Sequence, residues 1–233
     1  MDQPIIYSDG TQCWRNNSSE LHRDGDLPAI IYSNGKQEWH RNGMLHRVGD
    51  LPAIIHSNGK QEWYKNGKRH RDGDLPAVIQ PGGNRFWYKN DMLHRDNDLP
   101  AIIYSNGSQY WYKNDQLHRD RDLPARIESD GTQEWYKNGQ RHREGDLPAV
   151  IYSDGTQCWY KNGERHRCGD LPVIITEKIY SSGEKKYLAK YYVNGIFKSE
   201  AEIDEESYNI CKYDPNRPML SEYQFIDLEI ETI

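Results

Sequence analysis

A period of 24 residues governs most of this chain. The pair His-Arg recurs at that spacing, beginning at His22, His46, His70, His94, His118, His142 and His166. Such a period indicates a structural repeat, in which each unit contacts its neighbours and shares a core with them. The letters His-Arg-Asp at 22–24 occur in kinase catalytic loops, but later copies replace the third letter with Val48, Glu144 or Cys168. We therefore expect a structural role for this motif and no enzyme activity.

Each unit carries the letters of two tight turns. One unit reads DLPAIIYSNGKQEWHRNGMLHRVG from Asp26, and in it an Asn-Gly pair separates an apolar run from a run that contains Trp39, while a second Asn-Gly pair follows. Such pairs supply the positive φ of hairpin turns. The apolar runs are short and rich in β-branched residues. The sequence therefore predicts an all-β fold, an extended antiparallel β-hairpin repeat array built as a single-sheet meander or solenoid.

The repeat divides the chain into four parts. We expect an irregular N-terminal repeat over 1–25, six regular 24-residue repeats over 26–169, a degenerate repeat over 170–200 and an acidic C-terminal cap over 201–233. Alternating Ile226, Leu228 and Ile230 predict a final strand inside the cap. Residues 1–169 hold 23 basic and 23 acidic side chains, so the net charge of −6 arises entirely after them. A balanced array of this kind does not favour general binding to phosphate backbones.

Substitutions among the units predict which side chains are buried. One unit carries charged residues at two positions of its first strand but keeps Leu123, Ala125 and Ile127. Because side chains alternate along a strand, we expect this line to face the core and Ile30 and Tyr32 of another unit to face outward or to be only half covered. The recurring tryptophan is expected to be the structural core of each unit: Trp14, Trp39, Trp63, Trp87, Trp111, Trp135 and Trp159.

One stretch of the repeat resembles a known family. The run WYKNGKRHRDG over 63–73, with its copies WYKNGQRHREG and WYKNGERHRCG, resembles the MORN repeat, a hairpin unit of nearly this length. It is closer to a variant with DLPA between units, found in large DNA viruses of amoebae and in some bacteria, and YYVNGIFKSEAEI over 191–203 resembles a second MORN subtype. The resemblance implies a hairpin array and suggests peripheral binding to anionic lipids.

Outward-facing tyrosines and a basic run form the candidate interaction surface. Tyrosine is enriched at protein interfaces, where its rigid ring offers both apolar and polar contact. The surface comprises Tyr32, Tyr64, Tyr88, Tyr104, Tyr112, Tyr136, Tyr152, Tyr160, Lys68, Arg69 and Arg71. Our first hypothesis is a non-enzymatic scaffold that binds a protein partner or assembles with itself. Peripheral binding to anionic membrane lipids is the alternative, and a nucleic-acid-associated virion protein is a weaker one.

No residue pattern calls for a cofactor or a metal. Equivalent histidines would lie on the order of 10 Å apart if two strands intervene, too far to share one zinc ion. We expect His46 or His70 to bond a nearby turn or the aspartate that starts the next unit. The four cysteines share no spacing and are expected to be reduced thiols at the surface or half-buried. With no signal peptide or membrane-length apolar run, the expected location is cytoplasmic, or the host cytoplasm or virion if the protein is viral.

Overall fold

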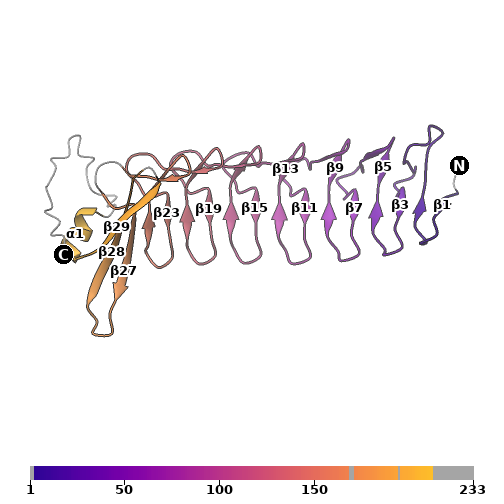
Figure 1. Cartoon of the computed structure of the whole chain (residues 1–233). Helices are drawn as coiled ribbons and strands as arrows, with labels where there is room; N and C mark the ends of the chain where they lie inside the picture. Colours follow the sequence, from indigo (N-terminus) through magenta and orange to yellow (C-terminus); the bar gives the residue numbers. More distant parts are fainter. Residues whose placement is uncertain (1–2, 168–170, 194, 212–233) are drawn as a thin grey trace.

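The computed structural model describes residues 3–167, 171–193 and 195–211. Within them the chain forms a long row of short hairpins that ends in a longer hairpin and a helix near the C-terminus (Figure 1). Each regular unit adds two antiparallel strands to one 17-stranded sheet and folds one further hairpin beside it. The prediction of an all-β, antiparallel hairpin array is confirmed.

The large sheet is a meander in which each strand pairs with the next sheet strand along the chain. In spatial order its strands are β1 (Ile5–Ile6), β2 (Gln12–Cys13), β3 (Ile30–Ile31), β4 (Gln37–Glu38), β7 (Ile54–Ile55), β8 (Gln61–Glu62), β11 (Val78–Ile79), β12 (Arg85–Phe86), β15 (Ile102–Ile103), β16 (Gln109–Tyr110), β19 (Arg126–Ile127), β20 (Gln133–Glu134), β23 (Val150–Ile151), β24 (Gln157–Cys158), β27 (Ile174–Ile179), β28 (Lys185–Val193) and β29 (Ile196–Ile203).

The second turn of each regular unit closes a separate two-stranded hairpin, which the sequence had indicated only as a turn leading onward. The strand pairs are β5 (His40–Arg41) with β6 (Met44–Leu45), β9 (Tyr64–Lys65) with β10 (Lys68–Arg69), β13 (Tyr88–Lys89) with β14 (Met92–Leu93), β17 (Tyr112–Lys113) with β18 (Gln116–Leu117), β21 (Tyr136–Lys137) with β22 (Gln140–Arg141), and β25 (Tyr160–Lys161) with β26 (Glu164–Arg165).

The two Asn-Gly turns of a unit have different geometries. In the second turn both Asn42 (φ 49°) and Gly43 (φ 77°) have positive φ, which is the pattern of a two-residue type I′ hairpin. In the first turn only Gly35 (φ 86°) does, while the side chain of Asn34 accepts a 3.0 Å hydrogen bond from the backbone N–H of Lys36. Asparagine therefore serves as a conformationally tolerant residue in one turn and as a side-chain acceptor in the other.

A third left-handed turn precedes each Leu-Pro-Ala segment. Gly25 and Asp26 both have positive φ, and the same holds for the corresponding pairs of the following units. At one of these turns the glycine position is occupied by Arg121, with φ 62°. A side chain with a Cβ is strained there, since left-handed backbone costs most residues about 1–2 kcal/mol.

The predicted division between buried and exposed lines is confirmed for the alanine and for Tyr32, which is half-buried, but is wrong for the leucine and for Ile30. Ala29 is fully buried and Ile30 is 7% exposed, whereas Leu27 is 47% exposed and Ile31 is half-buried. The strands of the array are only two residues long, so the alternation of a continuous strand does not extend through the bends on either side. The core therefore takes the alanine and the isoleucine that follows it, and the leucine lies at the surface.

The tryptophans lie in the interior of the array. Each indole ring is between 2% and 6% exposed. The backbone N–H of Trp39 donates to the carbonyl of Ala53 in the next unit (2.8 Å), and the same bond recurs at Trp63, Trp87, Trp111 and Trp135. Each of these tryptophans is thus bonded through its backbone to the next unit.

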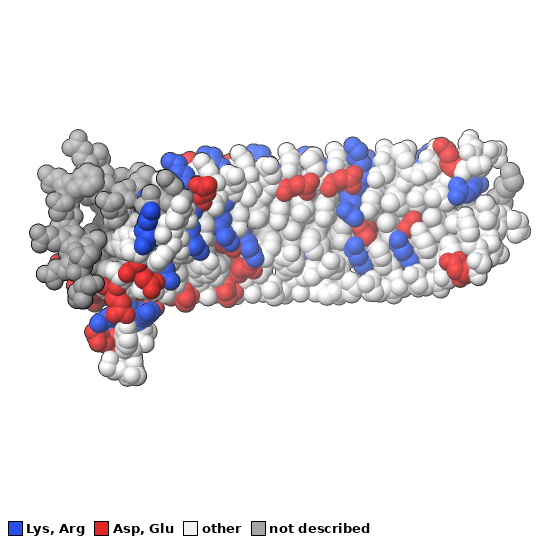
Figure 2. Space-filling view, viewed as in Figure 1, with Lys and Arg blue, Asp and Glu red and all other residues white. Residues whose placement is uncertain are grey.

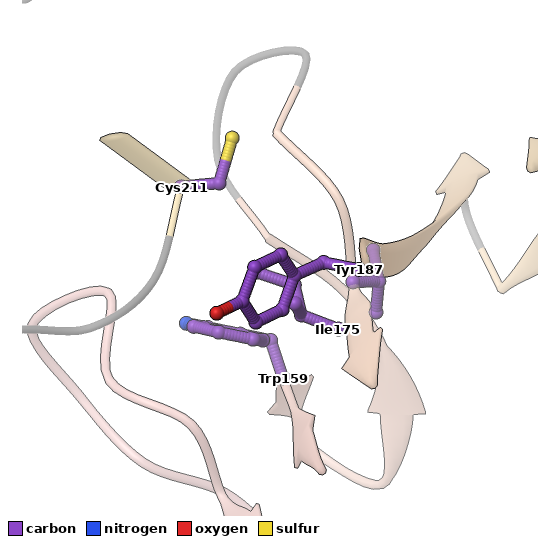
Figure 3. Packing of buried hydrophobic residues seen from close by; sticks show 5 residues of the cluster. Trp159, Ile175, Tyr187 and Cys211 are labelled. Carbon is purple, nitrogen blue, oxygen red and sulfur yellow. The ribbon is translucent and has the colours of Figure 1, made fainter. Parts of the chain in front are cut away.

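The C-terminal end is built differently. Strands β27, β28 and β29 are six, nine and eight residues long, and helix α1 (Glu205–Cys211) follows them. Tyr187 and Ile175 gather beside Trp159 and, with Val173 and Cys211, form a buried apolar cluster (Figure 3). The ring of Tyr208 from α1 stacks on Tyr187 with 3.7 Å between centroids. The predicted strand at 226–230 lies outside the described residues.

The prediction of reduced thiols is confirmed for Cys13 and Cys158, but the predicted surface or half-buried position is wrong for all three described cysteines. Cys13 and Cys158 are buried because they precede a core tryptophan, and Cys211 because it packs in the C-terminal cluster. Burial raises the pKa of the Cys158 thiol to about 11. Cys168 lies outside the described residues.

Candidate interaction surface

A polar cluster closes each regular unit on itself. The guanidinium of Arg47 lies 3.8 Å from the ring centroid of Trp39, and its Nε and Nη2 donate to the two carboxylate oxygens of Asp26 at 2.8 and 2.9 Å. The indole N–H of Trp39 donates to the carbonyl of Asp26 (3.0 Å). The hydrogen bond from Arg47 lowers the pKa of Asp26. The planar guanidinium of arginine can stack on the indole and bond both carboxylate oxygens at once, and the ammonium group of lysine can do neither.

The same cluster recurs along the array and links each unit to the next. Its other members are Asp50, Trp63 and Arg71; Asp74, Trp87 and Arg95; Asp98, Trp111 and Arg119; Asp122, Trp135 and Arg143; and Asp146, Trp159 and Arg167. In each case the arginine also donates to the proline carbonyl five residues on, as Arg47 does to Pro52 (3.3 Å). Arg71, predicted as a contact residue, therefore belongs to a structural cluster.

The histidines bridge neighbouring units through the turns. The backbone N–H of Asn66 donates to Nδ1 of His46 in the preceding unit (3.2 Å), which agrees with the expected turn contact. The carboxylate partner differs from the expected one. Nε2 of His70 meets Asp72, two residues later (2.9 Å), because Asp74, which starts the next unit, is bonded to Arg95.

The predicted tyrosines fall into two rows. Tyr32, Tyr104 and Tyr152 follow strands of the large sheet. Tyr64, Tyr88, Tyr112, Tyr136 and Tyr160 each begin the first strand of a small hairpin. Tyr152 is 40% exposed and the others are half-buried. Lys68 is exposed in its hairpin.

Three glutamates, Glu38, Glu62 and Glu134, are buried in the array and paired with basic side chains, and the last two lie on either side of the middle units. Glu62 is 3% exposed, and its carboxylate meets His56 (2.7 Å), Lys60 (2.8 Å) and Arg69 (3.2 Å). Burial alone would raise the pKa of Glu62, but hydrogen bonds from Lys60 and His56 hold it at about 2. Further along, Glu134 is 5% exposed and lies between Arg126 (3.0 Å) and Arg141 (2.8 Å). Glu62 and Glu134 each pair with the arginine seven residues later, whereas Glu38 pairs with Lys36 and His40.

Between these charged groups the two middle units carry an aromatic patch. The two units that flank them have glutamate before tryptophan and arginine seven residues later, whereas the middle units have Phe86 with Leu93 and Tyr110 with Leu117. Tyr104 joins the two units, because its ring makes edge contacts with Phe86 (6.0 Å between centroids) and Tyr110 (5.1 Å).

We call Phe86, Tyr88, Tyr104, Tyr110, Tyr112, Leu93 and Leu117 the central aromatic patch. Figure 2 shows the corresponding stretch of surface as largely free of charged side chains, with basic and acidic groups on both sides of it. Sequence reasoning treated its tyrosines as equal to those of other units. The paired change from Glu and Arg to aromatic and Leu was the signal that could have distinguished them.

Three of the four tyrosine hydroxyls of the patch differ from those of Tyr136 and Tyr110, which bond to glutamates. The hydroxyl of Tyr136 donates to Glu134 (3.0 Å), and that of Tyr110 donates to Glu128 (2.8 Å). Among the residues that the structure describes, Tyr88, Tyr104 and Tyr112 have no hydroxyl hydrogen bond. Because a partly buried phenol normally has a polar partner, these three groups are the available donors of the patch.

A concavity on the described surface lies between two units on the tryptophan side. This groove of about 450 Å³ is lined by side chains that include Leu123, Trp135 and His142. Several of its charged groups are already paired, as in the contact of Lys137 with Glu144 (3.1 Å). Within 3–167, 171–193 and 195–211 there is also no group of three or more His, Cys, Asp or Glu side chains arranged to hold a metal.

The chain was compared with protein families, curated proteins and solved structures. No family model, no curated protein and no solved structure matches this chain. In the described part of the chain, the single helix is too short and too polar to cross a membrane.

Proposed function

We propose that this protein is a non-enzymatic scaffold that binds a protein partner through the central aromatic patch. The observation that carries the proposal is the contrast between the recurring residues and the patch. Asp, Trp and Arg of each unit are occupied with one another and with neighbouring units. The patch is an interruption of the repeat chemistry that presents half-buried rings and free hydroxyls.

The composition of the patch supports binding to protein. Tyrosine and phenylalanine are enriched at interfaces, while charged residues are depleted at interface centres and retained around them. The patch has this arrangement, since the groups around Glu62 and Glu134 flank it. The cations of those groups are paired with carboxylates, which reduces their attraction for anionic lipids or nucleic acid.

The test is a pull-down from the source cell with the intact chain as bait, followed by crosslinking to locate the contacts. We expect a defined partner whose crosslinks fall near the middle units and whose capture persists at moderate salt. The double variant Tyr104→Ser/Tyr112→Ser should lose the partner. Tyr7→Ser is the matched control, because Tyr7 is 46% exposed but lies in the first unit.

Two further assays can contradict the proposal. Salt-sensitive pelleting with vesicles that contain anionic lipid, without a protein partner, would favour the membrane alternative. Salt-sensitive retardation of nucleic acid in a gel would favour the third hypothesis. If the wild type and the double variant captured the partner equally well, the binding surface would lie outside the central aromatic patch.

A further inference from the structure

The spacing of the tyrosine row constrains what can lie along it. Tyr88 and Tyr112 occupy equivalent positions in successive hairpins, each paired across its hairpin with a leucine, Leu93 or Leu117. Each unit adds two strands to the sheet, so equivalent residues are separated by about 9.6 Å, twice the ~4.8 Å strand spacing. A ligand that contacts both tyrosines in the same manner needs a repeat of nearly that length.

A polyproline II helix has such a repeat. It has three residues per turn and rises ~3.1 Å per residue, so equivalent side chains recur every ~9.3 Å. Its backbone carbonyls have no internal partners, and proline lacks an N–H that would need one. A β-strand or an α-helix does not match as well, since equivalent side chains recur at ~6.6–6.8 Å and ~5.4 Å respectively.

The chemistry of the patch matches the same ligand. The rings of Tyr88 and Tyr112 and the leucines between them offer apolar surface for proline side chains. The unpaired hydroxyls of Tyr88, Tyr104 and Tyr112 can donate to the ligand's free carbonyls. At Tyr64 and Tyr136 the corresponding hydroxyls donate to glutamates, at 3.4 and 3.0 Å.

The margin of the patch is acidic. The hairpins that carry Tyr88 and Tyr112 close with Asp91 and Asp115, where most other units have glycine. Both aspartates are exposed. Oδ1 of Asp91 accepts a hydrogen bond from the backbone N–H of Arg69 (2.8 Å), and Oδ1 of Asp115 accepts one from the backbone N–H of Leu93 (2.7 Å). No described donor bonds Oδ2, so these groups suit a ligand that carries arginine or lysine beside its prolines.

We propose that the central aromatic patch binds a proline-rich segment in the polyproline II conformation, with a proline at every third residue and a basic residue at its end. The segment lies along the array and places successive prolines against Tyr88 and Tyr112. This inference rests on the proposed scaffold function and specifies the class of its partner.

The test uses the full chain and a labelled peptide of four Pro-Pro-Leu triplets with an arginine at each end, about 40 Å long at ~3.1 Å per residue. Fluorescence anisotropy should give saturable binding in the micromolar range. A peptide with glycine in place of every proline should bind at least about tenfold more weakly, because it must be ordered on binding. Omission of the arginines should weaken binding a few-fold, in a salt-dependent manner.

Matched variants separate the hydroxyls from the packing of the rings. Tyr88→Phe/Tyr112→Phe keeps both rings and should weaken the peptide about tenfold, as expected for two lost hydrogen bonds. Tyr64→Phe is the control and should change the affinity less than twofold, because that hydroxyl already has a partner in Glu62. Equal affinity of the double variant and the wild type, or equal binding of the glycine peptide, would overturn the proposal.

Failure of this inference can be told apart from failure of the scaffold function. If the peptide does not bind while a captured protein still crosslinks to the patch, the scaffold stands and the polyproline assignment is wrong. Self-association measured by sedimentation and abolished by Tyr88→Phe/Tyr112→Phe, again without peptide binding, would identify a second copy of the chain as the occupant. Absence of both would overturn both proposals.

Discussion

The repeat array and the C-terminal hairpin solve the problem of stability in different ways. The array uses two-residue strands and repeats one Asp, Trp and Arg cluster in every regular unit. The C-terminal part uses strands of six to nine residues and an apolar cluster that combines β27, β28 and α1. Short strands bury little surface, so the array depends on stacking and an ion pair inside each unit and on hydrogen bonds between units, such as that of Arg47 to Pro52. The longer strands instead gain from packing in a conventional core.

The largest effect is expected at the centre of the array. Trp111→Ala removes a buried ring, its bond to the carbonyl of Asp98 (2.9 Å) and the surface on which Arg119 stacks. We expect a loss of about 3–5 kcal/mol. Because each unit contacts only its neighbours, urea unfolding followed by circular dichroism should become biphasic. A single transition with an unchanged midpoint would show that the units are not coupled through this residue.

Tyr187→Ala should give a somewhat smaller and local effect. The variant removes the ring that stacks on Tyr208 and fills the cluster beside Trp159, at a cost of about 3 kcal/mol. We expect limited proteolysis to cleave first within 176–211, while the array before it stays protected. Simultaneous cleavage of both parts would indicate that the array depends on its C-terminal end.

Acid should weaken the array before the apolar cluster. The pKa of Glu38 and of Glu62 is held at about 2, and the Arg47 hydrogen bond lowers that of Asp26. The unfolded chain therefore binds protons at higher pH than the folded one, so this stabilisation is complete above about pH 5 and declines as the pH falls towards 2.

Thermal unfolding followed by tryptophan fluorescence measures this decline, and the Tm should fall steadily between pH 5 and pH 2.5. Glu62→Gln should flatten the dependence, because one of the titrating carboxylates is gone. A Tm that stays constant over this range would mean that the buried carboxylates keep ordinary pKa values.

The smallest expected effect is a stabilising one. Arg121→Gly removes the strain of a side chain at φ 62° and should raise the stability by about 1 kcal/mol. Gly73→Ala is the reverse change at the equivalent turn (φ 74°) and should lower it by a similar amount. Calorimetry of the two variants checks the opposite signs, and shifts in the same direction would exclude backbone conformation as the cause.

The turns and hairpins of the array could be predicted because their residues are local in sequence. The burial of Ile30 and the exposure of Leu27 could not, because two-residue strands do not propagate the alternation on which the prediction relied. The stacking of Arg47 on Trp39 was also missed, although arginine recurs as regularly as tryptophan. The central aromatic patch depends on exchanges at two positions seven residues apart, whose proximity only the folded hairpin reveals.

The cluster of Asp26, Trp39 and Arg47 lies entirely within one 24-residue unit. An in-frame gain or loss of a whole unit would therefore leave every such cluster complete and present the same backbone edges to its new neighbour. The protein can change its reach by duplication or deletion without a compensating mutation. The length of the array can therefore change in whole units, and under the proposed function the two middle units determine where along that length a partner is held.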